Sequence, residues 1–94
     1  MVNYEVAYIL DPNLSEEALG ALTEKFSEQV RTMGGEIAGM DAWGKKRLAY
    51  EINGFTEGFY FIMRFKASPE TAAELARVMK LSDGIVKSLM LRSN

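Results

Sequence analysis

Residues 58–66 read GFYFIMRFK, a run rich in aromatic side chains that contains one arginine, Arg64. Successive side chains of a β-strand point to opposite faces of the sheet, so only one alternating set of this run can face the core. One set would bury Arg64, whereas the other set is entirely apolar. We therefore expect a strand that buries Phe59, Phe61, Met63 and Phe65 and exposes Tyr60, Ile62, Arg64 and Lys66.

The N-terminal third of the chain predicts a strand followed by a helix. Residues 3–10 alternate between apolar and polar side chains, the pattern of a half-buried strand. Ser15 is a favourable helix N-cap, and apolar residues then recur at three- and four-residue steps up to the glycine pair at 34–35. Because glycine commonly ends a helix, we expect the helix to stop there.

A long strand and a hairpin turn are expected before the quoted run. Residues 36–52 read as one irregular strand, with Gly39 and Gly44 as expected sites of a bulge or bend. The Asn53-Gly54 pair favours a tight hairpin. We expect residues 55–57 to lengthen its loop.

After the quoted run, Ser68 and Pro69 have the side chains of a helix start, and residues 85–92 alternate as a last strand. The resulting order is strand-helix-strand-strand-helix-strand. This order predicts an α+β, ferredoxin-like split β-α-β fold over residues 1–94, a single domain. It has a four-stranded antiparallel sheet with two helices on one face. The other face is then open, and it must be polar, bind something or be covered by a partner.

The composition argues against catalysis. The chain contains neither cysteine nor histidine, so disulfides, thiolate metal sites and most nucleophile–base pairs are impossible. Its glycines do not have the spacing of a phosphate-binding loop. We therefore expect no enzyme activity, no cofactor or metal, and no small-molecule substrate. The longest apolar run, residues 59–63, is too short to cross a membrane, and we expect a cytoplasmic protein.

Charge is distributed unevenly along the chain, whose formal net charge is −2. Residues 1–41 carry eight acids and two bases, whereas residues 42–94 carry five acids and nine bases. The basic half includes the segment WGKKRLAYEI, residues 43–52, which sets three consecutive cations between a tryptophan and a tyrosine. Such a protein can bind RNA if the fold separates its acidic and basic surfaces.

Two interpretations of the open face follow from the alternation. Residues 57–65 partly match the third-strand signature of RNA-recognition modules, but that phase would bury Arg64, so we exclude such a module. If the hairpin places Tyr50 opposite Tyr60, an apolar patch forms from Leu48, Tyr50, Ile52, Tyr60 and Ile62, bordered by Lys46, Arg64 and Lys66. A patch of this kind suits a protein partner. The alternative is that the aromatics are good strand formers and the cations are solubilising edge charges.

Several of these residues carry a resemblance to a known family. Tyr4-Glu5, the segment from Gly44 to Tyr50 in the pattern Gly-x-(Lys/Arg)-Arg-Leu-Ala-Tyr, Gly58-Phe59-Tyr60, and the LAR sequence at 75–77 resemble ribosomal protein six of the bacterial small subunit. The resemblance covers essentially the whole chain. Many members of that family carry basic residues where this chain has Val2 and Asn3, and proline where it has Glu51.

The resemblance implies a structural role in the platform of the small ribosomal subunit. It implies binding to the central domain of 16S ribosomal RNA together with ribosomal protein eighteen. The residues that we expect to bind RNA are Lys45, Lys46 and Arg47, followed by Lys80, Lys87 and Arg92. The residues that we expect to form a protein-partner patch, by the face argument alone, are Leu48, Tyr50, Tyr60, Ile62 and Arg64. The alternative function is a stand-alone interaction or regulatory domain that self-associates through its open face.

Overall fold

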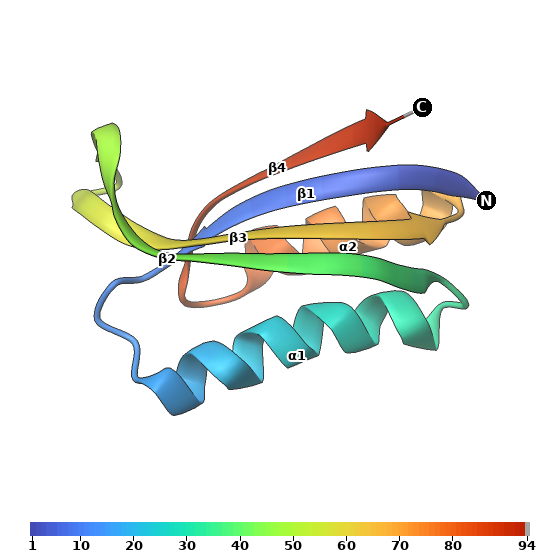
Figure 1. The fold of residues 1–94 in the computed structure, drawn as a ribbon, viewed down its shortest axis with the longest axis horizontal. Helices are drawn as coiled ribbons and strands as arrows, with labels where there is room; N and C mark the ends of the chain where they lie inside the picture. Colours follow the sequence, from blue (N-terminus) through green and yellow to red (C-terminus); the bar gives the residue numbers. More distant parts are fainter. Residues whose placement is uncertain (94) are drawn as a thin grey trace.

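The protein has six helices and strands arranged in two layers (Figure 1). The structure, a computed structural model, describes residues 1–93. Its elements are β1 (Val2–Leu10), α1 (Glu16–Thr32), β2 (Glu36–Ile52), β3 (Phe55–Ala67), α2 (Pro69–Leu81) and β4 (Ile85–Ser93). All neighbouring strands pair antiparallel in the order β2-β3-β1-β4, and both helices lie on one side of the sheet. The expected ferredoxin-like fold is confirmed.

Both helices begin where their capping residues predict. The Ser15 side chain accepts a hydrogen bond from the Ala18 N–H at 3.1 Å, and the Ser68 side chain accepts one from the Thr71 N–H at 3.2 Å. Each bond satisfies a backbone donor that the first helical turn cannot pair internally. Glutamates in the first turn of each helix add favourable charge at the positive end of its dipole. The helix positions are therefore encoded locally.

The core lies between the helices and the inner face of the sheet. Met63 and Phe65 are buried there, Phe59 and Phe61 pack against the same cluster, and Arg64 is exposed, so the predicted phase of β3 is confirmed. Tyr8 is completely buried at the centre of this layer. Its ring stacks on Phe61 with centroids 5.4 Å apart, and its hydroxyl donates to the Met40 sulfur at 3.9 Å. Burial raises the pKa of the Tyr8 hydroxyl, which therefore stays protonated in the folded state.

The hairpin between β2 and β3 is tighter than the sequence suggested. Ile52 pairs with Phe55, so the loop contains only Asn53 and Gly54, and the predicted lengthening through residues 55–57 is wrong. Both turn residues have positive φ, 49° and 84°. This backbone matches the twist of antiparallel strands, and asparagine and glycine adopt it readily, so nothing requires a longer loop.

The predicted register that places Tyr50 opposite Tyr60 is also wrong, because Tyr60 pairs with Gly44. From Arg47 to Ile52, β2 takes five residue steps, whereas β3 takes two steps between their partners Glu57 and Phe55. The three extra residues cannot join the ladder, so they form a large bulge. Bulges increase local twist and bend the strand that carries them.

Close packing of β1 against β3 predicts that Gly58→Ala destabilises the fold. An added Cβ would lie 2.4 Å from the Ile9 Cγ2 atom and 3.0 Å from the Leu10 carbonyl oxygen. We expect the free energy of unfolding in urea to fall by about 1–3 kcal/mol, the usual cost of overpacking. Gly20→Ala is the control, because its Cβ meets nothing within 4 Å in helix α1. It should raise stability by up to about 1 kcal/mol. Equal effects of the two substitutions would contradict the packing argument.

Candidate partner and nucleic-acid interface

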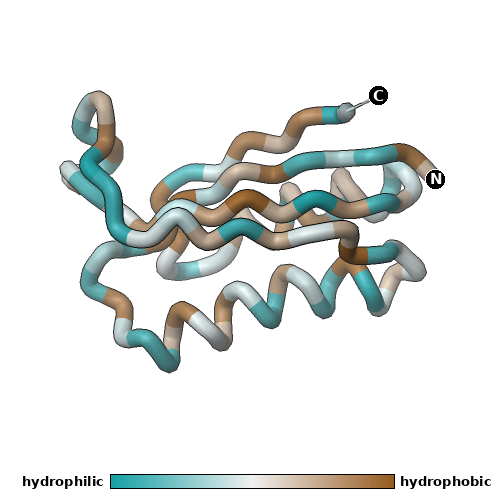
Figure 2. The backbone as a smooth tube through the Cα atoms, viewed as in Figure 1, coloured by the Kyte–Doolittle hydropathy of each residue, from teal (hydrophilic) through white to brown (hydrophobic). Residues whose placement is uncertain are grey.

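The distal part of β2 leaves the plane of the sheet and rises on the side away from the helices (Figure 1). We call residues 44–52 the arm. It begins at Gly44, whose φ of 79° favours glycine, and it ends at the two-residue turn. In Figure 2 the arm is hydrophilic where it leaves the sheet, and further out hydrophobic stretches alternate with hydrophilic ones. The bend brings the hydrophobic stretches over the open face.

An apolar groove of about 230 Å³ lies between the arm and the open face of the sheet. Its lining comes from all four strands: Ala7 and Ile9 of β1, Leu48, Ala49, Tyr50 and Ile52 of the arm, Tyr60 of β3, and Lys87 and Leu89 of β4. We call it the open-face groove. Three residues of the predicted protein-partner patch, Leu48, Tyr50 and Tyr60, therefore do meet, and Ile52 of the apolar patch lies with them. They meet through the bulge and not through the pairing that the sequence suggested.

A small second core attaches the arm to the sheet. Leu48 is 8% exposed and packs with Ile9 and Val86, while Ile52 and Tyr60 border this cluster. Burying a leucine side chain stabilises such a contact by about 1.5–3 kcal/mol. Residues 44–47 and Ile52 of the arm pair with β3, and the buried Leu48 anchors the bulged residues between them.

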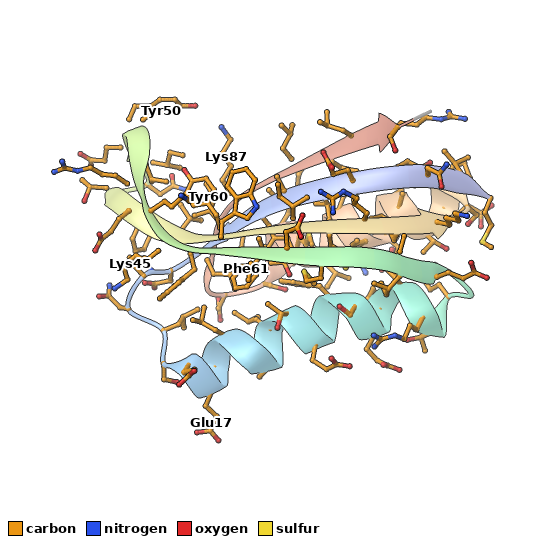
Figure 3. All side chains as sticks on the ribbon, in the orientation of Figure 1. Glu17, Lys45, Tyr50, Tyr60, Phe61 and Lys87 are labelled. Carbon is orange, nitrogen blue, oxygen red and sulfur yellow. The ribbon has the colours of Figure 1, made fainter. Side chains whose placement is uncertain are left out.

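Lys87 closes the outer end of the groove. Its Nζ donates to the Tyr50 hydroxyl at 3.2 Å and lies 5.6 Å from the centroid of the Tyr50 ring, so one amino group contacts the tyrosine at its hydroxyl end (Figure 3). Tyr50 nevertheless remains 64% exposed. Lys87, which the sequence placed with the RNA-binding cations, therefore faces the groove.

The three consecutive cations project from both sides of the arm. Lys45 pairs with Phe59 and Lys46 with Gly58, so neighbouring cations point to opposite faces. The Lys45 Nζ lies 5.2 Å from the Phe59 ring centroid, and the Lys46 Nζ lies 5.9 Å from the Trp43 ring centroid. All three side chains, including Arg47, are exposed. The run therefore offers positive charge around the arm instead of along a single row.

Ile62 and Arg64, the other two residues of the predicted patch, do not line the open-face groove. Ile62 pairs with Ala7 at its border. The Arg64 guanidinium forms ion pairs with Asp41 at 2.8 Å and Glu5 at 3.3 Å, linking β1, β2 and β3. The hydrogen bond to Asp41 is the main cause of a raised pKa for Arg64. Its role on this face is to join strands.

Comparison with known proteins identifies the family. Residues 3–92 match the family described as Ribosomal protein S6. The chain belongs to the ribosomal protein S6 family. It is therefore a structural, non-enzymatic protein of the small ribosomal subunit, with its place in the ribosome of the cytoplasm.

Individual relatives of the S6 family match almost end to end. The chain is 52% identical over 92 residues to small ribosomal subunit protein bS6 of Desulforamulus reducens, covering 98% of this chain and 97% of that protein. It is 47% identical over 94 residues to the bS6 protein of Heliobacterium modesticaldum, covering 100% and 98%. The crystal structure of 30S ribosomal protein S6 from Thermotoga maritima superimposes with a TM-score of 0.92 at 27% identity, covering 98% and 87%.

In this member of the S6 family, two predicted RNA-binding cations lie away from the arm. Lys80 is in the last turn of α2, on the helix-covered side, and Arg92 pairs with Tyr4 near the end of β4. Both are exposed, but neither lines the open-face groove. Their role in RNA binding stays a prediction.

Some residues that line or support the groove were not predicted from the sequence. Ile9 and Leu89 line it, and Val86 supports it. The alternating pattern of β1 places Ile9 on the open face, so Ile9 could have been predicted from the sequence. Val86 lies at an irregularity between β1 and β4, where simple alternation fails. Within residues 1–93, no group of acidic side chains is placed to hold a metal ion, and neither helix is long and apolar enough to cross a membrane.

Leu48→Ala is predicted to loosen the bulged part of the arm, from residue 48 to the turn, while the main core stays folded. Removing the buried side chain should lower the free energy of unfolding by about 2 kcal/mol. Amide hydrogen exchange should speed up in residues 48–52 and stay unchanged in β1. Leu91→Ala is the control, because Leu91 is 50% exposed on the same face. Unchanged exchange in the arm of the Leu48 variant would contradict its anchoring role.

Proposed function

We propose that this protein binds the central domain of 16S ribosomal RNA, in the platform of the small subunit, jointly with ribosomal protein eighteen. The resemblance of the Gly44–Tyr50 segment to ribosomal protein six supports both partners. The proposal rests mainly on one observation. The arm, a single continuous segment, has three exposed cations at its base and forms one wall of an apolar groove at its end.

The two chemistries of the arm suit two different partners. Apolar and aromatic side chains with a cationic border are typical of the centre and rim of a protein interface, so the open-face groove fits ribosomal protein eighteen. Exposed lysine and arginine side chains gain most from phosphate groups, so Lys45, Lys46 and Arg47 fit the RNA backbone. Because both surfaces share the arm, the two partners would meet on it.

The acidic half of the chain does not oppose this arrangement. Helix α1 carries four exposed glutamates on the layer below the sheet, and Figure 3 places Glu17 on the side away from Tyr50. At physiological ionic strength, charges that are separated by more than about 8 Å are largely screened. The base of the arm carries three consecutive cations, so this part of the surface is basic although the net charge of the chain is −2.

A binding titration tests the proposal directly. A 16S central-domain RNA fragment is titrated with the protein at two salt concentrations, with and without ribosomal protein eighteen. We expect weak binding alone and tight binding with the partner, and the affinity should fall steeply with salt. Absence of binding under all four conditions would overturn the proposal and favour the stand-alone, self-associating domain.

The triple variant Lys45→Ala, Lys46→Ala, Arg47→Ala should weaken RNA binding in the presence of ribosomal protein eighteen. The slope of log affinity against log salt should shrink by about 0.7–0.9 for each phosphate group that the variant no longer binds. The matched control removes three exposed helix cations, Lys25, Arg31 and Arg77, and so changes the net charge equally. An equal fall in affinity for the two triple variants would mean that only bulk charge matters.

A charge placed in the open-face groove should block the protein partner. Leu89 is 53% exposed and lines the groove, so Leu89→Lys should weaken binding of ribosomal protein eighteen by at least roughly tenfold, as measured by calorimetry without RNA. Leu81→Lys is the control, because Leu81 is 70% exposed at the end of α2 and outside the groove. Sedimentation of both variants alone also measures any self-association.

A further inference from the structure

Trp43 is an unusual surface residue. It is the only tryptophan of the chain, and 54% of its surface is exposed. It occupies the irregularity of β2 between Ala42, which pairs with Phe61, and Gly44, which pairs with Tyr60. Trp43 therefore has no partner residue across the strand, and its position is set by the bulge at the base of the arm.

The indole ring of Trp43 contacts a cation. The Lys46 Nζ lies 5.9 Å from the ring centroid, the range of a cation–π interaction. Such a contact uses one face of the ring. Since more than half of the side chain is exposed, a second flat, apolar surface remains available to a ligand.

Charge identifies the occupant of this surface. Lys45, Lys46 and Arg47 follow the indole within four residues, and all three are exposed. An apolar protein side chain would gain nothing from three cations, whereas a nucleotide presents a flat base beside an anionic phosphate. Unpaired bases stack on aromatic side chains while neighbouring phosphates bind lysine and arginine.

We propose that Trp43 is a stacking site for one unpaired nucleobase of RNA. Lys46 covers the opposite face of the indole and is the cation placed to bind a flanking phosphate, while Lys45 and Arg47, which project from the other side of the arm, add positive charge near it. This inference rests on the proposed RNA-binding function and deepens it, because it requires a single-stranded or bulged nucleotide at the base of the arm. A uniform duplex, whose bases are stacked within the helix, would not satisfy it.

The intrinsic fluorescence of Trp43 can be used to test the stacking site. Because no other tryptophan is present, the indole fluorescence of this chain reports on Trp43 alone. The 16S central-domain fragment is titrated into the complex with ribosomal protein eighteen, and a parallel titration of Trp43→Leu subtracts the fluorescence of the partner. We expect quenching that follows the binding curve.

Affinity measured by filter binding gives the second readout. Removing one base–aromatic stack should weaken RNA binding of Trp43→Leu by roughly 5- to 100-fold. Trp43→Phe, which keeps an aromatic face, should be weakened less. The salt dependence should be unchanged in both variants, because no cation is removed. Leu91→Ala is the control for removal of an exposed apolar side chain away from the arm. Urea unfolding should give near-wild-type stability for all three variants.

The outcomes separate this inference from the proposed function. Tight, salt-sensitive RNA binding without quenching, or with equal affinity for Trp43→Leu, would overturn the stacking site and leave the proposed function intact. Quenching by ribosomal protein eighteen before RNA is added would assign the indole to the protein interface and also overturn the inference. Absence of RNA binding by the unmodified protein would overturn the proposed function itself.

Discussion

Both helices pack on the same face of the sheet, and the rest of the structure depends on this constraint. The alternation of β1 and β3 sends Tyr8, Met63 and Phe65 into the core between the layers. The same alternation sends Ile9 and Tyr60 to the other face, where no helix covers them. Apolar side chains on an open face need a cover, because leaving them in water forfeits about 25 cal/mol for each Å² that could be buried. The chain supplies part of that cover itself.

That partial cover follows from unequal strand lengths at the hairpin. The turn at Asn53 and Gly54 fixes the end of the ladder, while β2 carries three more residues than β3 beyond the pair Arg47–Glu57. These three extra residues have no partners in β3, so they form a bulge. The bend at the bulge places Leu48 against Ile9. The arm therefore leaves a groove instead of sealing the face. Its basic residues come before the bend, so they lie beside the groove and not inside it.

The parts of the fold that depend on local chemistry could be predicted from the sequence. The caps at Ser15 and Ser68 fix the helix starts, and Arg64 fixes the phase of β3, because one charged residue decides between two faces.

The register of the hairpin could not be predicted. Alternation says which face a residue occupies only while the ladder is regular, and a bulge of three residues shifts every partner without changing the composition. The same limit applies to the site. Leu48, Tyr50 and Tyr60 do lie together, although the bulge and not the expected pairing brings them there, whereas Ile62 and Arg64 share a face of β3 with Tyr60 but lie outside the groove. The ion pairs of Arg64, which involve two other strands, could be recognised only from the three-dimensional pairing.

The contact between Lys87 and Tyr50 limits how the two partners can share the arm. A phosphate that recruited Lys87 would have to replace the hydrogen bond at 3.2 Å and the contact with the tyrosine ring. Each of these exposed interactions is worth only about 1 kcal/mol, so the replacement is feasible, but it would release Tyr50 from the wall of the groove. RNA binding at Lys87 would then alter the surface offered to the protein partner. The cations at the base of the arm hold no groove residue in place, so they can bind phosphate while the groove keeps its shape.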